Sequence, residues 1–278
     1  MSFINDIKYA YKQASIVEKI IYINVFLFLI TVLFTSFITS WFALPSSLNE
    51  FISKPWTLIT YAFIHERLFH ILSNLLILYY IGNLFLDFHT RKQFLNFYFL
   101  GIIVGGFAFI LNYYLTKKNG APLGGASAAV TTIFVAIATK IPRYSLRLRF
   151  IGSVELWVLA AIWVSLSILQ LVNSDNGGAI AHLSGAIFGF IYSKQLEKGN
   201  DIGKWFENLI NLFSNSFKSK KKSNLKTVYK SKNKTNIESV SKTKQRKIDD
   251  ILDKISKSGY ESLTQEEKDF LFRAGKNN

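Results

Sequence analysis

Residues 180–192 read I-A-H-L-S-G-A-I-F-G-F-I-Y, a run of apolar and small residues that contains one histidine. With its flanks the run is long enough for a membrane-spanning helix. Because an ionisable side chain within a bilayer costs on the order of a few kcal/mol, His182 is predicted to have a function. Gly185 and Gly189 lie on one face of this helix and allow a neighbouring backbone to approach closely. We therefore expect His182 to serve the element that packs against these glycines.

The chain separates into an apolar part and a basic part. Half of its 278 residues are hydrophobic, although the formal net charge is +15. Residues 1–192 carry 13 Lys or Arg and 7 Asp or Glu, whereas residues 193–278 carry 20 and 11. This division predicts a membrane body followed by a basic tail. The chain has no cysteine, which excludes disulfides, thiolate metal sites and a cysteine nucleophile.

Six apolar runs have the length of membrane-spanning helices. They cover residues 20–42, 68–88, 94–115, 125–141, 152–172 and 178–194. No small-residue cleavage site follows the first run, so we expect it to remain as an uncleaved first span. Residues 44–67 are too polar to span and are predicted to lie at the membrane interface. The predicted fold class is all-α: a polytopic membrane protein with a bundle of six transmembrane helices and a cytosolic helical tail.

Basic residues in the connections predict the orientation of the spans. One set of connections carries nine Lys or Arg: three Lys in residues 1–19, then Arg91, Lys92, Lys140, Arg143, Arg147 and Arg149. The opposite set carries four: Lys54, Arg67, Lys117 and Lys118. The positive-inside rule therefore places both termini in the cytosol. The predicted localisation is a multi-pass integral membrane protein of the cell (inner) membrane.

The polar residues within the spans fall at one depth. In this topology the second, fourth and sixth spans all run inward from outside, so His70, Ser127 and His182 lie toward the outer side. Asn74 is one helical turn from His70 on the same face. A serine hydroxyl becomes a nucleophile when an imidazole accepts its proton. His70, Asn74 and the free amide of Ser127 at a helix start could donate to a developing oxyanion.

Simpler interpretations of these residues exist. A serine or asparagine within a span often only forms a hydrogen bond between helices, and paired glycines often only pack against a neighbouring helix. The stretch from His65 to His70 resembles the H-E-x-x-H zinc motif, but its second histidine comes five residues after the first. On a regular helix the two rings would point about 140° apart and could not share one metal. We therefore predict no metal and no cofactor.

Three motifs together resemble the rhomboid family of intramembrane serine proteases. They are His65 with His70 and Asn74, G-A-S-A at residues 125–128, and A-H-L-S-G at residues 181–185 with Gly189. The resemblance covers roughly residues 15–195 and implies a six-span rhomboid-like bundle. It implies that Ser127 is the nucleophile and His182 the general base of a dyad without aspartate. His70 and Asn74 would then be oxyanion donors, with His65, Gly125, Gly185 and Gly189 in supporting roles.

The resemblance also implies a substrate class and exposes three departures. Family members cleave membrane-anchored proteins near the outer edge of their spans, with water from a cavity open to the outside. This chain has Ala128 where the family usually has glycine after the serine. It has Thr131 where an aromatic residue often stacks on the histidine. The Trp-Arg pair common in the family's first long connection is not found in residues 44–67.

The tail has three predicted parts after the membrane body. The predicted domains are a cytosolic N-terminal segment (1–19), the six-span protease domain (20–195), an interfacial amphipathic helix with a basic cluster (196–222), a disordered linker (223–245) and a small helical hairpin (246–276). The amphipathic face is predicted from Ile202, Trp205, Phe206, Leu209, Phe213 and Phe217, followed by Lys218 and Lys220 to Lys222. In the hairpin, Thr264 and Glu267 predict a capping box.

Three functions compete at this stage. The leading one is an intramembrane serine endopeptidase with transmembrane protein substrates. The others are a catalytically silent rhomboid-like protein that binds or escorts membrane segments, and a small-solute transporter or channel. We expect the lipid bilayer as a partner, with a cytosolic protein as a further partner of the tail. No nucleic-acid recognition motif supports the basic tail as a nucleic-acid binder.

Overall fold

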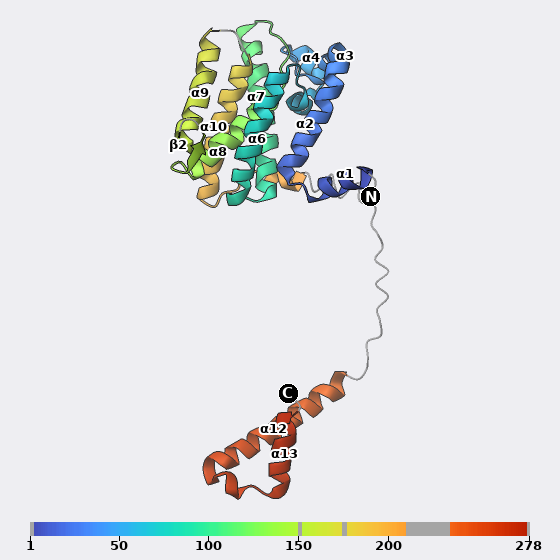
Figure 1. Ribbon diagram of the computed structural model, residues 1–278, viewed down its shortest axis with the longest axis vertical. Coiled ribbons are helices and arrows are strands. Elements are labelled where there is room, and N and C mark those ends of the chain that lie inside the picture. Colours follow the sequence, from blue (N-terminus) through green and yellow to red (C-terminus); the bar gives the residue numbers. More distant parts are fainter. Residues whose placement is uncertain (1–2, 150–151, 174–176, 210–233, 277–278) are drawn as a thin grey trace. The chain divides into compact units, whose positions relative to one another are not determined.

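The computed structural model describes residues 3–149, 152–173, 177–209 and 234–276. The chain divides into two compact units, residues 1–218 and 219–278. The helices of the first unit (Figure 1) are α1 (Phe3–Gln13), α2 (Ile16–Leu33), α3 (Thr35–Phe42), α4 (Leu48–Ser53), α5 (Thr57–Thr60), a 3-10 helix (Tyr61–Phe63), α6 (Leu68–Phe88), α7 (Arg91–Thr116), α8 (Ser127–Lys140), α9 (Leu156–Asn173) and α10 (Gly177–Glu197). A further helix begins at Lys204 and is described as far as Leu209.

Each of the six runs predicted as spans contains an α-helix. Within the described residues, α2, α6 and α7 are long and apolar enough to cross a membrane, and α8 and α9 are shorter apolar helices. The first run differs from its prediction because it forms two helices that meet at Phe34. It also starts earlier, at Ile16, since Ser15 and Glu18 form a capping box. These helices make the chain a polytopic helical membrane protein.

Large apolar side chains cover the outside of the bundle. Leu33 of α2 is 75% exposed, Phe69 of α6 is 86% exposed and Val172 of α9 is 77% exposed. In water such side chains would be unfavourable, whereas a bilayer solvates them. The exposed apolar surface therefore marks the parts of these helices that face lipid.

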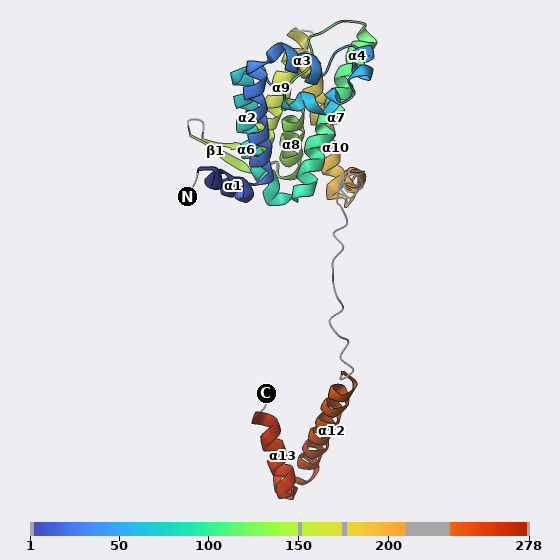
Figure 2. The same ribbon diagram turned by 90° about the vertical axis from the view of Figure 1, so that its right-hand side faces the viewer.

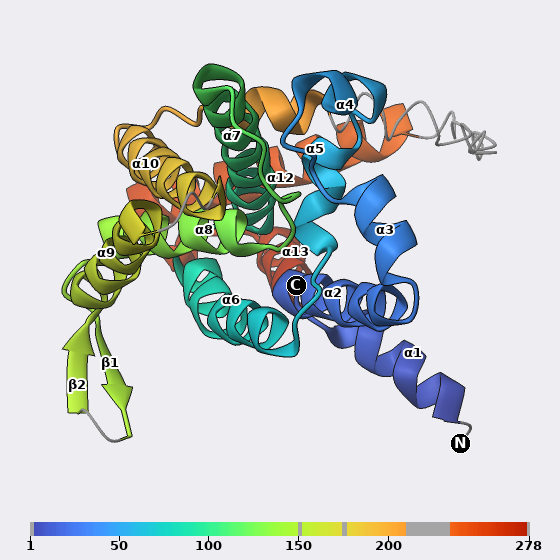
Figure 3. The same ribbon diagram turned by 90° about the horizontal axis from the view of Figure 1, so that it is seen from above.

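Helix α8 lies at the centre of the bundle, surrounded by α6, α7, α9 and α10 (Figure 3). Its 14 residues would extend only about 21 Å, less than the roughly 30 Å hydrocarbon core. Nearly every side chain from Ser127 to Ala138 is buried. A short helix is tolerated here because its side chains meet protein rather than lipid.

The long connection of residues 44–67 folds onto the end of the bundle as α4, α5 and the 3-10 helix. The hydroxyl of Tyr61 donates to the carbonyl of Ile102 at 2.8 Å, and its own carbonyl accepts the amide of Gly125 at 2.9 Å. Leu44 and Leu123 exchange two backbone hydrogen bonds, as in a β-bridge. Thus the connection fixes the loop that leads into α8.

Two short strands depart from the all-α expectation. Strand β1 (Ser145–Leu148) pairs antiparallel with β2 (Gly152–Glu155), so α9 begins at Leu156 and the predicted fifth span at residue 152 started too early. The physical reason is the pairing itself, because residues 152–155 satisfy their backbone groups on β1 instead of in a helix. The hairpin lies at the same end of the bundle as α1 (Figures 1 and 2).

Residues 201–209 dock against that same end of the bundle. Asp201 accepts a hydrogen bond from the hydroxyl of Tyr192 at 2.5 Å, and Glu207 accepts one from Asn96 at 3.1 Å. The rings of Phe206 and Phe99 lie 6.3 Å apart. In contrast, Trp205 is 58% exposed. The predicted amphipathic helix therefore begins with one face on the protein, and its later residues, Phe213, Phe217, Lys218 and Lys220 to Lys222, lie outside the described residues.

The second unit contains α12 (Lys234–Ser258), a 3-10 helix (Tyr260–Ser262) and α13 (Gln265–Lys276). The predicted linker of residues 223–245 is too long, because α12 already begins at Lys234, and residues 223–233 lie outside the described residues. No glycine or proline interrupts residues 234–258, so nothing in the backbone stops the helix there. The predicted capping box forms, with the Thr264 amide donating to Glu267 at 2.8 Å and the Glu267 amide to the Thr264 hydroxyl at 3.4 Å.

Candidate active site

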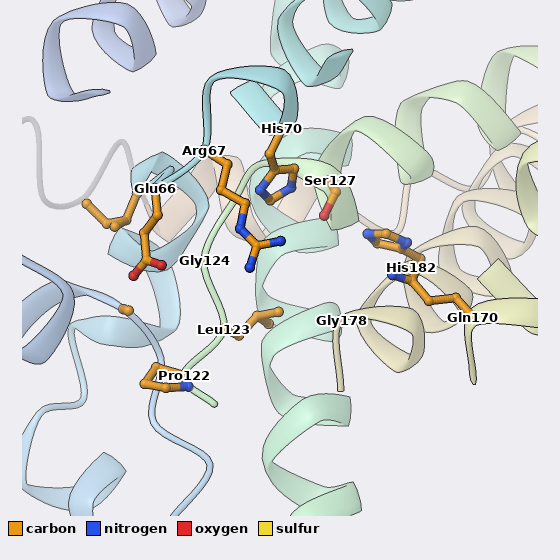
Figure 4. A pocket seen from close by; sticks show the side chains of 12 residues that line it. Glu66, Arg67, His70, Pro122, Leu123, Gly124, Ser127, Gln170, Gly178 and His182 are labelled. Carbon is orange, nitrogen blue, oxygen red and sulfur yellow. The ribbon is translucent and has the colours of Figure 1, made fainter. Parts of the chain in front are cut away.

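A cavity of about 360 Å³ lies where α6, α8 and α10 begin. Its lining combines three residues selected from the sequence, Ser127, His70 and His182 (Figure 4). The other residues that line it are Ala43, Ile64, Glu66, Arg67, Pro122, Leu123, Gly124, Gln170 and Gly178. The lining thus draws on residues that are far apart in the sequence.

Ser127 is the first residue of α8 and is only 8% exposed. Gly125, two residues earlier, has a φ of +116°, which glycine adopts at little cost. A Cβ at this position would lie 2.6 Å from Cε1 of His70. The turn before α8 therefore requires glycine both for its backbone angle and for the space next to His70.

The buried His65 stabilises this turn through a hydrogen bond. Its Nε2 accepts the amide of Ala126 at 3.2 Å, and the side chain is 1% exposed. Burial, followed by the nearby His70, lowers the pKa of His65 to about 3, so the ring is neutral at physiological pH and can remain an acceptor. The rings of His65 and His70 lie 5.2 Å apart.

This proximity corrects one argument made from the sequence. His65 precedes α6, which begins at Leu68, so the 140° separation of a regular helix does not apply. The zinc hypothesis gains nothing from the correction, because Nε2 of His65 is occupied by the Ala126 amide. In the described ranges, no three His, Cys, Asp or Glu side chains are grouped closely enough to hold a metal ion.

His70 and Asn74 occupy different positions relative to the cavity. His70 lines it, whereas Asn74, which is 2% exposed, is not among the described residues that do. Nδ2 of Asn74 donates to the carbonyl of His70 at 2.8 Å. One of its two amide hydrogens is thus used within α6, and the other remains for a further acceptor.

His182 faces Ser127 across the cavity. The hydroxyl oxygen of Ser127 and the ring of His182 point toward one another (Figure 4). On its other side, Nδ1 of His182 lies 3.3 Å from the hydroxyl oxygen of Ser167 in α9. This arrangement offers a hydroxyl and an imidazole in one cavity, as proton transfer between them requires.

The family of the chain follows from residues 53–198, which match the model of the rhomboid domain. The chain belongs to the rhomboid family. The matched residues include His65, His70, Asn74, Ser127 and His182, and they cover about half of the chain. The tail from residue 233 to residue 276 matches a second model, which describes a family of unknown function.

Curated relatives agree with this membership. The chain is 32% identical over 170 residues to RHOMBOID-like protein 12, mitochondrial, of Arabidopsis thaliana, which covers 55% of this chain and 50% of the relative. It is 27% identical over 161 residues to Rhomboid-like protease 3 of Toxoplasma gondii, covering 54% and 56%. It is 26% identical over 153 residues to the human Presenilin-associated rhomboid-like protein, mitochondrial, covering 52% and 38%. The chain therefore matches only about half, or less, of each relative's length.

Glycines bring the helices of this rhomboid domain into backbone contact. A Cβ on Gly185 would lie 2.6 Å from the carbonyl oxygen of Ala128, and one on Gly189 would collide with the backbone of Thr132. The Thr132 hydroxyl bridges the two helices, since its oxygen lies 2.8 Å from the Ala128 carbonyl and 3.1 Å from that of Gly185. As expected from the sequence, the glycine face of α10 meets the helix that carries Ser127.

Several residues near the site were not selected from the sequence. Thr131 of α8 accepts a hydrogen bond from the indole of Trp163 of α9 at 2.8 Å. The Trp163 ring lies 6.4 Å from that of His182. Trp163 and Ser167 are one helical turn apart in α9, which would place them on one face. The sequence contains that spacing but does not say which helix the face meets.

Proposed function

We propose that this rhomboid protein is an intramembrane serine endopeptidase that cleaves membrane-anchored proteins. The observation that carries the proposal is the shared cavity, in which the Ser127 hydroxyl and the His182 ring face each other. The family membership and the printed name of one relative, Rhomboid-like protease 3, support the same reaction class.

The reaction follows from the roles of these groups. His182 accepts the proton of Ser127 while the serine oxygen attacks the scissile carbonyl carbon. The tetrahedral intermediate then collapses, His182 protonates the leaving amine, and an acyl ester remains on Ser127. A water molecule from the cavity attacks the ester with His182 again as base, which releases the acid and regenerates the serine. No cofactor takes part in this scheme.

Oxyanion stabilisation would come from the same end of α8. The amide of Ser127 has no partner within its own helix, because the first amides of a helix lack one. His70 lines the cavity and can donate a second hydrogen bond. We assign Asn74 to the same role through its remaining amide hydrogen. His65, Gly125, Gly185 and Gly189 hold the serine and the histidine in position.

The proposed orientation places the cavity at the outer side of the membrane and both termini in the cytosol. The basic connections support this, because α1, the β-hairpin and residues 201–209 lie at the opposite end of the bundle (Figures 1 and 2). We propose the cell (inner) membrane as its location and transmembrane proteins as its substrates. The tail unit is proposed to bind a cytosolic partner.

Two single substitutions test the proposal. Ser127→Ala and His182→Ala should each abolish cleavage of a single-span substrate by the purified protein in lipid, because each removes one half of the nucleophile and base pair. Their double mutant should be no slower than either one. A fluorophosphonate probe should label the wild type at Ser127 and should not label Ser127→Ala.

The same experiment separates the enzyme from the silent binding protein. Clear turnover by purified Ser127→Ala would exclude the proposed nucleophile. Substrate binding without cleavage or labelling in the wild type would instead favour the escort function. The intact Ser127 and His182 favour the enzyme over that alternative.

A further inference from the structure

We propose that Ser167 of α9 is a positioning residue for His182, which it holds in the tautomer that can act as a base toward Ser127. This inference rests on the proposed serine protease function and adds a third member to its dyad. Ser167 lies 3.3 Å from Nδ1 of His182 and is only 5% exposed. Neither the Ser127 motif nor the His182 motif contains this residue, which lies in a different helix.

The direction of the hydrogen bond follows from a second contact. The Ser167 hydroxyl donates to the carbonyl of Trp163, one turn earlier in α9, at 3.2 Å. A hydroxyl has a single hydrogen, so the Ser167 oxygen is left as an acceptor toward His182. Nδ1 of His182 must then carry the proton. In the neutral ring this leaves Nε2 without a hydrogen, as a general base for Ser127 requires.

Trp163, one turn before Ser167, connects α9 to α8 next to His182. Its indole N–H donates to Thr131 of α8 at 2.8 Å, and its ring lies 6.4 Å from the His182 ring at an angle of 33°. The small Thr131 leaves room for this indole and supplies its acceptor. A residue of α9 thus supplies an aromatic ring beside His182.

The chemistry of the third member differs from that of a carboxylate. A neutral hydroxyl can fix the tautomer and the ring orientation, but it adds no negative charge to stabilise the imidazolium. Loss of the Ser167 hydroxyl should therefore slow the proton transfer without weakening substrate binding. Loss of the partner that orients a metal-binding histidine typically lowers activity about 10-fold to 100-fold, and we expect a loss of similar size here.

Kinetics of three α9 variants test the role. We expect Ser167→Ala to lower kcat about 10-fold to 100-fold with KM unchanged, and to slow fluorophosphonate labelling of Ser127 by a similar factor. Ser167→Thr should recover much of the rate, because a helical threonine keeps a hydroxyl that can donate one turn back. Ser165→Ala is the matched control, since Ser165 is exposed on the same helix, and it should behave as the wild type.

A spectroscopic readout is independent of catalysis. Nitrogen NMR of protein labelled at histidine, with His182→Gln used to identify the signals, should find the proton on Nδ1 of His182 in the wild type. The Ser167→Ala spectrum should shift toward the other tautomer. A wild-type proton on Nε2, or equal rate losses in Ser167→Ala and Ser167→Thr, would overturn the positioning role.

The outcomes distinguish the two proposals. Equal kcat in the wild type and Ser167→Ala overturns the role of Ser167 alone, provided that Ser127→Ala is inactive. A wild type no more active than Ser127→Ala overturns the protease function itself. Thermal unfolding of each variant shows whether a lost rate reflects a lost fold.

Discussion

His65 illustrates how a buried residue can shape the site without lining the cavity. It is 1% exposed, and its neutral Nε2 holds the amide that precedes Ser127. Because burial lowers its pKa to about 3 from an ordinary value near 6.5, unfolded chains bind a proton more readily than folded ones between these values. The contribution of His65 to stability is therefore complete above about pH 6.5 and falls as the pH decreases toward 3.

Two substitutions of His65 should separate the effect of its hydrogen bond from the effect of its volume. His65→Phe fills the space but leaves the Ala126 amide unpaired, which costs roughly 1–3 kcal/mol of stability. Displacement of the turn should also lower kcat about 10-fold to 100-fold. His65→Gln keeps an acceptor and should retain more of both quantities. Thermal unfolding and single-substrate kinetics measure them.

The stability of the wild type and of His65→Gln should differ most at acidic pH. Stability of the wild type should fall more steeply between pH 6.5 and 4 than that of His65→Gln, whose side chain does not titrate. Matching activity in His65→Phe and the wild type would show that the Ala126 amide does not need this acceptor.

At the scale of elements, the contact between α8 and α10 determines whether Ser127 and His182 can meet. Gly185 and Gly189 bring the two backbones together, and the Thr132 hydroxyl joins them. The glycines make the Thr132 contact possible, because its hydroxyl can reach carbonyls of both helices only when the helices are close.

Enlarging either glycine should separate these helices. Gly185→Leu and Gly189→Leu should each lower kcat by about 100-fold or more, since the added atoms would push α10 away from the Ser127 helix. Overpacking should also cost about 1–3 kcal/mol of stability. Ile187→Ala is the control on the same helix, because Ile187 is 61% exposed and should affect neither quantity. Full activity in both leucine variants would mean that this contact does not position the dyad.

At the scale of the whole molecule, the start of the tail belongs to the bundle. Residues 201–209 hold Tyr192 through Asp201 and Asn96 through Glu207. The compact unit ends at Lys218, beyond these contacts. None of the proposed site residues lies after Gly189, so the tail can contribute to stability without contributing to the chemistry.

Two truncations should show this difference. A chain that ends at Lys198 loses the acceptor of the buried Tyr192 hydroxyl, so its unfolding free energy should fall by roughly 1–3 kcal/mol. A chain that ends at Lys218 should unfold as the full-length protein does. Both should cleave substrate in detergent, measured at equal folded concentration. Complete inactivity of a folded 1–198 chain would place part of the working site in the tail.

Local pattern was sufficient for much of the fold and for the main candidate residues. Apolar runs predicted six helices, and the capping box at Thr264 and Glu267 formed where its spacing indicated. Ser127, His70 and His182 could be selected because polar groups are conspicuous in apolar spans. The glycine pattern of α10 indicated a close helix contact, because a helix face without side chains lets any neighbouring helix approach closely.

Only the tertiary structure decided how these elements face each other. The periodicity of apolar residues indicates which face of a helix is buried, but not which neighbour that face meets. Contacts such as Ser167 with His182 or His65 with Ala126 depend on how two elements are oriented relative to each other. The docking of residues 201–209 likewise depends on Tyr192 and Asn96, which belong to other helices. The sequence by itself therefore determined which residues could form the candidate site, and packing determined what holds them in place.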